Sequence, residues 1–96
     1  AYFFLLMEAM QDVAQELGLE REVAESLVSQ TAVGASQLAR KTKESTVVLR
    51  KKVTSPGGTT ERAVSEFEGG NLRGLVRNAL IAAKDRSIEL SEDLSN

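Results

Sequence analysis

The chain has 96 residues, a formal net charge of −2, 42% hydrophobic residues and only 4% aromatic residues. This length suits one small domain with an aliphatic core, and we expect self-association to add to its modest stability. The slightly acidic charge argues against a general nucleic-acid-binding protein. The chain contains no Cys and no His, which excludes disulfides, the usual zinc ligands and the usual general base. The absence of Cys also fits a reducing compartment, so we expect a cytoplasmic protein.

The first predicted element is a helix over residues 2–17, which Gly18 is expected to end. Hydrophobic residues recur in it at three- and four-residue spacing: Phe3, Leu6, Met10, Val13 and Leu17. Glu8 interrupts the apolar start far short of the ~20 residues that a membrane span needs, so no membrane segment is predicted. The sequence starts without Met, directly in this helix. We therefore expect a piece of a longer protein whose first helix is buried.

A second helix is predicted from about Glu20 to Lys41, with acidic residues in its first turn and basic residues in its last. Its middle consists of small residues around Gly34. A glycine inside a helix costs roughly 1 kcal/mol relative to alanine, so close packing against another helix would be a plausible compensation.

The second half of the sequence also has helical patterning. A short helix is predicted over residues 46–53, where the valine-rich sequence would equally suit a strand. A helix from Thr60 to about Glu68 follows and is ended by Gly69-Gly70, and Asn71 can cap a final long helix. We therefore predict an all-α fold in a single small helical domain.

The loop before Thr60 contains the only proline of the chain and two adjacent glycines. Pro56 fixes φ, and Gly57-Gly58 allow backbone angles that a Cβ would forbid. Thr59 or Thr60 is predicted to supply the N-cap hydroxyl of the next helix. Backbone N–H groups should then converge at the positive end of a helix dipole, which attracts a carboxylate or phosphate. An ordinary helix–helix connector is the alternative interpretation.

Basic residues are concentrated just before this loop, with one acid, Glu44, among them: Arg40, Lys41, Lys43, Arg50, Lys51 and Lys52. They either steer an anionic ligand to the loop or form an ordinary solvated face. No Walker or GxGxxG motif is present. The candidate site is therefore a loop that orients a small anion with backbone N–H groups and the hydroxyls of Ser55, Thr59 and Thr60.

Several segments, in this order, resemble the C-terminal domain of the pyrroline-5-carboxylate reductase family, and the resemblance spans essentially the whole chain. They are Ala1–Phe3, Gln30–Ala35, Leu49–Val53, Thr54–Thr60 and Arg86–Leu90. One departure is Ser45-Thr46-Val47-Val48, where many members carry a proline. It leaves the start of the short helix open and does not affect the loop.

The resemblance implies that residues 1–96 are a dimerisation and substrate-binding domain, and that an N-terminal Rossmann domain binding NADPH or NADH lies outside this chain. It implies interlocking helices of a homodimer core, rings of dimers in some members, and no nucleic-acid, membrane or metal partner. The implied substrate is 1-pyrroline-5-carboxylate, which is reduced to L-proline in proline biosynthesis. The fragment alone is expected to be inactive.

The resemblance also assigns roles in the loop. Ser55, Gly57, Gly58 and Thr59 would hold the substrate carboxylate, and the Thr60 hydroxyl would act catalytically by hydrogen-bonding the ring nitrogen. In an interlocked dimer, the small residues of the second helix could lie where helices of two subunits cross, or they could pack within one subunit: Gly34, Ala35 and Ala39.

Two other functions remain open on the residues alone. One is a related two-domain dehydrogenase acting on another small carboxylate, in which a helix lysine serves as acid; Lys84 is the only lysine in the last predicted helix. The other is a non-catalytic helical interaction module whose basic stretch binds an acidic partner or nucleic acid.

Overall fold

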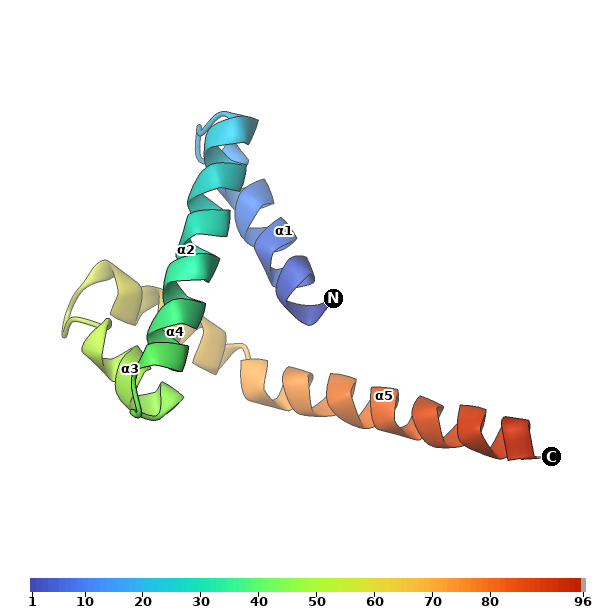
Figure 1. Ribbon diagram of the computed structural model, residues 1–96. Helices are drawn as coiled ribbons and strands as arrows, with labels where there is room; N and C mark the ends of the chain where they lie inside the picture. The colour runs from blue at the N-terminus through green and yellow to red at the C-terminus, as the bar shows by residue number, and fades with distance from the viewer. Residues whose placement is uncertain (96) are drawn as a thin grey trace. The chain divides into compact units, whose positions relative to one another are not determined.

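The computed structural model describes residues 1–95, which form five α-helices and no strand (Figure 1). The helices are α1 (Tyr2–Glu16), α2 (Arg21–Lys41), α3 (Thr46–Lys52), α4 (Thr59–Gly69) and α5 (Leu72–Ser95). The all-α prediction is confirmed, and the segment for which a strand was the alternative is helical. The described chain groups into two compact units, one comprising Ala1–Leu49 and the other beginning at Arg50.

In the first unit, α1 and α2 form a helical hairpin that turns at Gly18. The Gly18 N–H donates to Gln15 O at 3.0 Å, and the Leu19 N–H donates to Ala14 O at 3.1 Å. This pair of bonds is a Schellman motif, which requires a left-handed residue, and Gly18 supplies it with a φ of +109°. The predicted helix end is thus confirmed.

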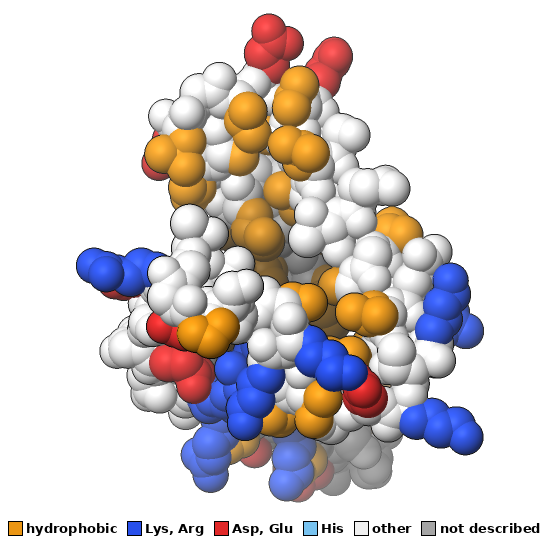
Figure 2. Space-filling view, turned by 90° about the vertical axis from the view of Figure 1, so that its left-hand side faces the viewer, with side chains coloured by type: hydrophobic (Ala, Val, Ile, Leu, Met, Phe, Trp, Pro, Cys, Tyr) orange, Lys and Arg blue, Asp and Glu red, His pale blue; other side chains and the backbone are white. Residues whose placement is uncertain are grey.

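Within its own unit, α1 stays exposed. None of its residues is buried, and the side chains of Phe3 and Leu5 are 81% and 68% exposed. Figure 2 shows hydrophobic side chains standing open on the surface. The prediction of a buried first helix is therefore wrong for the isolated chain. Consecutive apolar residues from Tyr2 to Leu6 point all around the helix, and one neighbouring helix covers only one side of it.

The middle of α2 consists of small residues, and two of its hydroxyls are hydrogen-bonded to backbone carbonyls of the same helix. The Thr31 hydroxyl donates to Leu27 O at 2.8 Å, and the Ser36 hydroxyl donates to Val33 O at 3.0 Å. A Cβ added to Gly34 would meet no atom within 4 Å. The chain thus gives Gly34 no close neighbour that would explain a glycine inside this helix.

Ser45 settles where α3 begins. Its hydroxyl accepts the Val48 N–H at 3.2 Å, which is the bond of an N-cap residue to the third helical residue. A serine cap therefore starts α3 at Thr46, although no proline stands there.

Asn71 joins α4 to α5 in the second unit. Its φ is +59°, the only positive value at a non-glycine residue in the described chain. Its N–H donates to Glu68 O at 3.1 Å and closes α4, while its Oδ1 accepts the Gly74 N–H at 3.3 Å and caps α5. Gly69 and Gly70 end α4 as predicted, but the left-handed residue is Asn71, since φ of Gly70 is −83°. The predicted cap on the last helix is confirmed.

Candidate functional site

The loop between α3 and α4 contains a tight turn over Ser55–Gly58. The Gly58 N–H donates to Ser55 O at 3.0 Å across the turn. Pro56 occupies the second position, and Gly57 occupies the third with a φ of +72°. This combination is a type II turn, in which the third residue needs a positive φ. Gly57 is therefore the position in the loop where backbone geometry demands glycine.

The start of α4 differs from the prediction. The N-cap is Gly58, with extended backbone angles and no side-chain cap hydrogen bond, so the prediction of a Thr59 or Thr60 N-cap is wrong. The turn explains the difference, because closing it places Gly58 O in reach of the Arg62 N–H at 3.4 Å and begins the helix at Thr59. Thr59 and Thr60 are thus the first two helical residues, and their hydroxyls are not used in capping.

The missing side-chain cap leaves backbone donors at this helix start. The first N–H groups of a helix have no partner within the helix, and here they belong to Gly58, Thr59, Thr60 and Glu61. The Gly58 N–H is committed to the turn. The donors left for an anion are therefore those of Thr59, Thr60 and Glu61, at the positive end of the α4 dipole.

Gly58 fits the loop through its lack of a side chain. A Cβ at this position would lie 3.1 Å from Ser55 O and 3.4 Å from Ser55 Cβ. Both distances are tight, so a larger residue would push against the turn. The structure therefore shows a steric reason for glycine at position 58, and its part in binding the carboxylate stays a prediction.

A shallow surface hollow lies beside the loop and includes only some of the predicted residues. Gly57, Gly58 and Thr59 line it, whereas Ser55 and Thr60 do not. The sequence analysis missed three further lining residues on α4: Glu61, Arg62 and Ser65. Helical periodicity was the available signal, because Thr59, Arg62 and Ser65 are three residues apart and share one face.

Charge around the loop is mixed. The last turn of α3 carries Arg50, Lys51 and Lys52. Arg62 and Glu61 are among the residues that line the hollow. The local excess of positive charge favours an anionic ligand. Lys51, Lys52 and Arg62 are exposed, which fits the solvated-face interpretation equally well, whereas Arg50 is half-buried.

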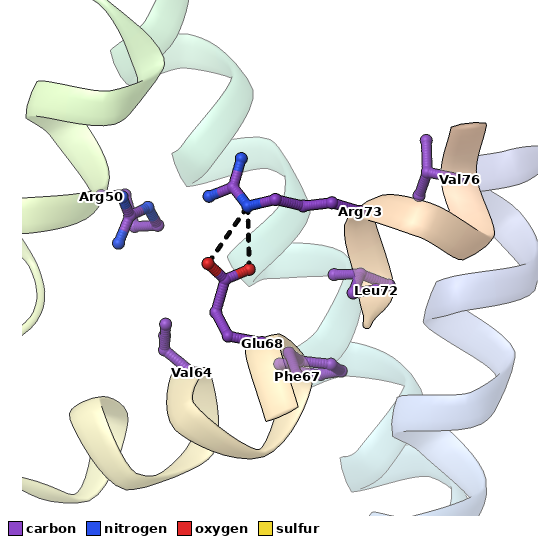
Figure 3. A pocket seen from close by; sticks show the side chains of 7 residues that line it. All are labelled: Arg50, Val64, Phe67, Glu68, Leu72, Arg73 and Val76. Carbon is purple, nitrogen blue, oxygen red and sulfur yellow. Dashed lines mark hydrogen bonds and ion pairs between the residues drawn. The ribbon is translucent and has the colours of Figure 1, made fainter. Parts of the chain in front are cut away.

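A second hollow lies at the α4–α5 corner and has a different character (Figure 3). Its walls are mostly apolar, and two of its lining residues form an ion pair, in which Arg73 Nε donates to both Glu68 carboxylate oxygens at 3.0 and 3.1 Å. The lining side chains are Arg50, Val64, Phe67, Glu68, Leu72, Arg73 and Val76. It offers contact area for apolar side chains and no set of convergent polar groups for a small substrate.

The described residues contain no group of three or more His, Cys, Asp or Glu side chains that could hold a metal ion. None of their helices is both long enough and apolar enough to cross a membrane.

Comparison with known proteins gives one consistent family. Residues 1–90 match the family model for pyrroline-5-carboxylate reductase dimerisation. The chain is 51% identical over 94 residues to a pyrroline-5-carboxylate reductase of Pseudomonas aeruginosa, covering 98% of the chain and 34% of that protein. For the Arabidopsis thaliana protein of the same name, identity is 49% over 92 residues, covering 96% of the chain and 33% of the relative.

Solved structures agree with this family. The chain superposes on a pyrroline-5-carboxylate reductase from Coxiella burnetii with a TM-score of 0.89 and 54% identity, covering 93% of the chain and 33% of that structure. A Plasmodium falciparum pyrroline carboxylate reductase with NADP bound gives a TM-score of 0.87 and 31% identity, with coverages of 90% and 34%. The chain thus spans about a third of the length of these relatives.

Proposed function

The chain belongs to the pyrroline-5-carboxylate reductase dimerisation family, and from this we propose that it is the C-terminal dimerisation and substrate-binding domain of such a reductase. The complete enzyme would reduce 1-pyrroline-5-carboxylate to L-proline with NADPH or NADH, in the cytoplasm. The observation that carries the proposal is the family match over residues 1–90, because it includes the whole Ser55–Thr60 loop.

We assign the substrate carboxylate to the start of α4. The N–H groups of Thr59 and Thr60 are available there, because the described structure has no side-chain cap hydrogen bond at the start of α4. Ser55 is exposed in the loop that precedes this helix start, and Gly57 and Gly58 give the loop its shape. These groups suit a carboxylate because helix N-termini carry partial positive charge. The Thr60 hydroxyl would then hydrogen-bond the ring nitrogen.

The cofactor would be held mainly outside this chain. When bound, NADPH or NADH supplies the hydride. The described residues contain no strand, and therefore no strand–glycine loop–helix unit of the Rossmann type. The loop residues would position the substrate for the reaction, and the complete protein would supply the dinucleotide site.

The dimer part of the proposal rests on what the chain leaves uncovered. Ala24 and Val28 are the buried hydrophobic residues of the described chain, while Phe3, Leu5 and Leu75 each expose more than three fifths of their surface. Burying one such side chain contributes about 1.5–3 kcal/mol, so several together favour association. A second copy of the chain is the proposed partner, and rings of dimers are the proposed higher assembly.

The first test is turnover by the complete enzyme. We expect NAD(P)H oxidation when 1-pyrroline-5-carboxylate is added, and much weaker NAD(P)+ reduction when 3-hydroxy acids are supplied with the oxidised cofactor. A folded dimeric enzyme that leaves 1-pyrroline-5-carboxylate unreduced would reject the proposed function.

The second test concerns Thr60. Thr60→Ala should lower kcat/KM by about 1–3 kcal/mol of transition-state stabilisation, because a hydrogen bond in the site is lost. Thr60→Ser retains the hydroxyl and should recover most of the activity. Thr46→Ala is the matched control, since Thr46 is an exposed threonine at the start of α3. An unchanged kcat/KM in Thr60→Ala would remove Thr60 from the mechanism.

A further inference from the structure

Thr54 stands between α3 and the loop and makes two hydrogen bonds back to α3. Its hydroxyl donates to Arg50 O at 2.5 Å, and its N–H donates to Lys51 O at 3.2 Å. Thr54 is partly buried, whereas its neighbours Val53 and Ser55 are exposed. The chain is therefore fixed to the end of α3 at one residue, directly before the turn begins.

The next hydrogen bond along the chain, across the Ser55–Gly58 turn, connects Thr54 to the candidate site. Ser55 follows Thr54 and accepts the Gly58 N–H through its carbonyl oxygen at 3.0 Å. Gly58 is the N-cap of α4. The Thr54 bonds to α3 and the turn bond are therefore joined by a single peptide link, and the turn leads directly to the donors at the start of α4.

From this arrangement we infer that Thr54 is a positioning residue of the substrate loop, an inference that rests on the proposed function. Its hydroxyl holds Ser55 and the turn in the orientation that presents the Thr59 and Thr60 donors to the carboxylate. Without that bond the loop samples other orientations, and the substrate must order it on binding. A preorganised site avoids this cost, so losing the anchor weakens substrate binding more than it slows the bound substrate.

The kinetic test uses the complete dimeric enzyme with 1-pyrroline-5-carboxylate as the varied substrate. Thr54→Val has nearly the same shape and lacks the donor. We expect its KM to rise about 3- to 10-fold, the effect of one lost hydrogen bond, with kcat changed by less than about 2-fold. Thr54→Ser keeps the hydroxyl and should restore the wild-type KM. Thr54→Ala serves as a second hydroxyl-free variant if Thr54→Val does not form the dimer.

Ser36→Ala is the matched control for the loss of a hydroxyl-to-carbonyl bond on a helix. The Ser36 hydroxyl donates to Val33 O at 3.0 Å in α2, and Ser36 lies ~160° around the helix from Gly34 at 100° per residue. Its KM should stay at the wild-type value. A Thr54→Val enzyme with wild-type KM, or a Ser36→Ala enzyme with the same rise in KM, would overturn the inference.

A second readout does not depend on turnover. Amide hydrogen exchange at Gly58 reports the turn bond to Ser55 O. We expect exchange there to accelerate in Thr54→Val, while amides in the interior of α4 keep their protection and Ser36→Ala matches wild type. Unchanged exchange at Gly58 would overturn the positioning role. If the wild-type enzyme does not reduce 1-pyrroline-5-carboxylate, the proposed function fails, and Gly58 exchange still decides whether Thr54 holds the turn.

Discussion

Gly57 is the residue whose backbone conformation decides the shape of the loop. Its φ of +72° lies in the region that side chains disfavour, yet an added Cβ would meet no atom within 4 Å. A substitution there is therefore penalised by backbone strain and not by crowding. Gly69, the last residue of α4, also has open space around an added Cβ but lacks a positive φ. The two glycines form a matched pair that separates these effects.

Gly57→Ala should destabilise the turn by about 1–2 kcal/mol, because alanine disfavours the left-handed region by that amount. Gly69→Ala should be neutral or slightly stabilising, since alanine is the better helix residue. Urea unfolding of both variants at one protein concentration measures the difference. In the complete enzyme, Gly57→Ala should also raise KM. Equal stabilities of the two variants would contradict the role given to the positive φ.

The residue types of the loop could be predicted from the sequence, but not the partners of its hydrogen bonds. Pro56-Gly57 indicated a turn, and the turn is present. The expected hydroxyl cap was wrong because the turn bond from Gly58 starts α4 one residue before Thr60. Propensity says that a threonine is a good cap; it does not say which residue takes the extended backbone angles of the N-cap. Whether the predicted site residues bind substrate stays a prediction.

At the scale of elements, the α4–α5 corner depends on one residue with two separable functions. Asn71 adopts a positive φ to close α4 and offers Oδ1 to cap α5. Asn71→Gly should keep the conformation and lose the cap, at a cost of a few tenths of a kcal/mol. Asn71→Ala should lose both, adding about 1–2 kcal/mol of left-handed strain. Stability should therefore fall in the order Asn, Gly, Ala.

Thermal or urea unfolding of the three proteins at equal concentration tests this order. An alanine variant as stable as the glycine variant would show that the positive φ carries no cost at Asn71. A glycine variant less stable than the alanine variant would contradict the predicted order, and because both variants lack Oδ1, the difference would come from the backbone and not from the cap.

The positions of the helices could be predicted from the sequence more closely than the caps and turn bonds that end them. Gly18 ends the α1 region as expected, and the bounds of α2 differ from the prediction by one residue. The 46–53 segment could not be assigned from its valines, because a short apolar run suits a strand or a helix equally. Ser45 and the Thr54 bonds decide for the helix. Such side-chain-to-backbone bonds are invisible to periodicity, which reports only the faces that are apolar.

At the scale of the whole molecule, the sequence is rich in hydrophobic residues, but the chain buries few of them. Hydrophobic residues make up 42% of the sequence, yet no residue of α1 is buried. The consecutive apolar residues at the start of α1 need cover on several sides, and the hollow at the α4–α5 corner offers apolar walls. A second copy of the chain would supply the missing cover, which the sequence suggested through the small size of the chain and the small residues of α2.

Gly34 allows the most direct test of that second copy. Within the chain a larger side chain at this position meets no atom within 4 Å, so Gly34→Leu should not reduce the stability of a monomer. If α2 crosses a helix of the partner there, the added side chain forces the helices apart. Overpacking of this kind costs about 1–3 kcal/mol, which corresponds to a dimer weakened about 5- to 150-fold.

Ser29→Leu is the matched control, because Ser29 is exposed and lies ~140° around α2 from Gly34 at 100° per residue. Sedimentation equilibrium across a concentration series gives the dissociation constant of each variant. We expect Gly34→Leu to weaken the dimer and Ser29→Leu to leave it unchanged. A Gly34→Leu dimer as tight as wild type would move the subunit contact away from the middle of α2. The glycine would then need another explanation, since alanine would stabilise the helix by about 1 kcal/mol.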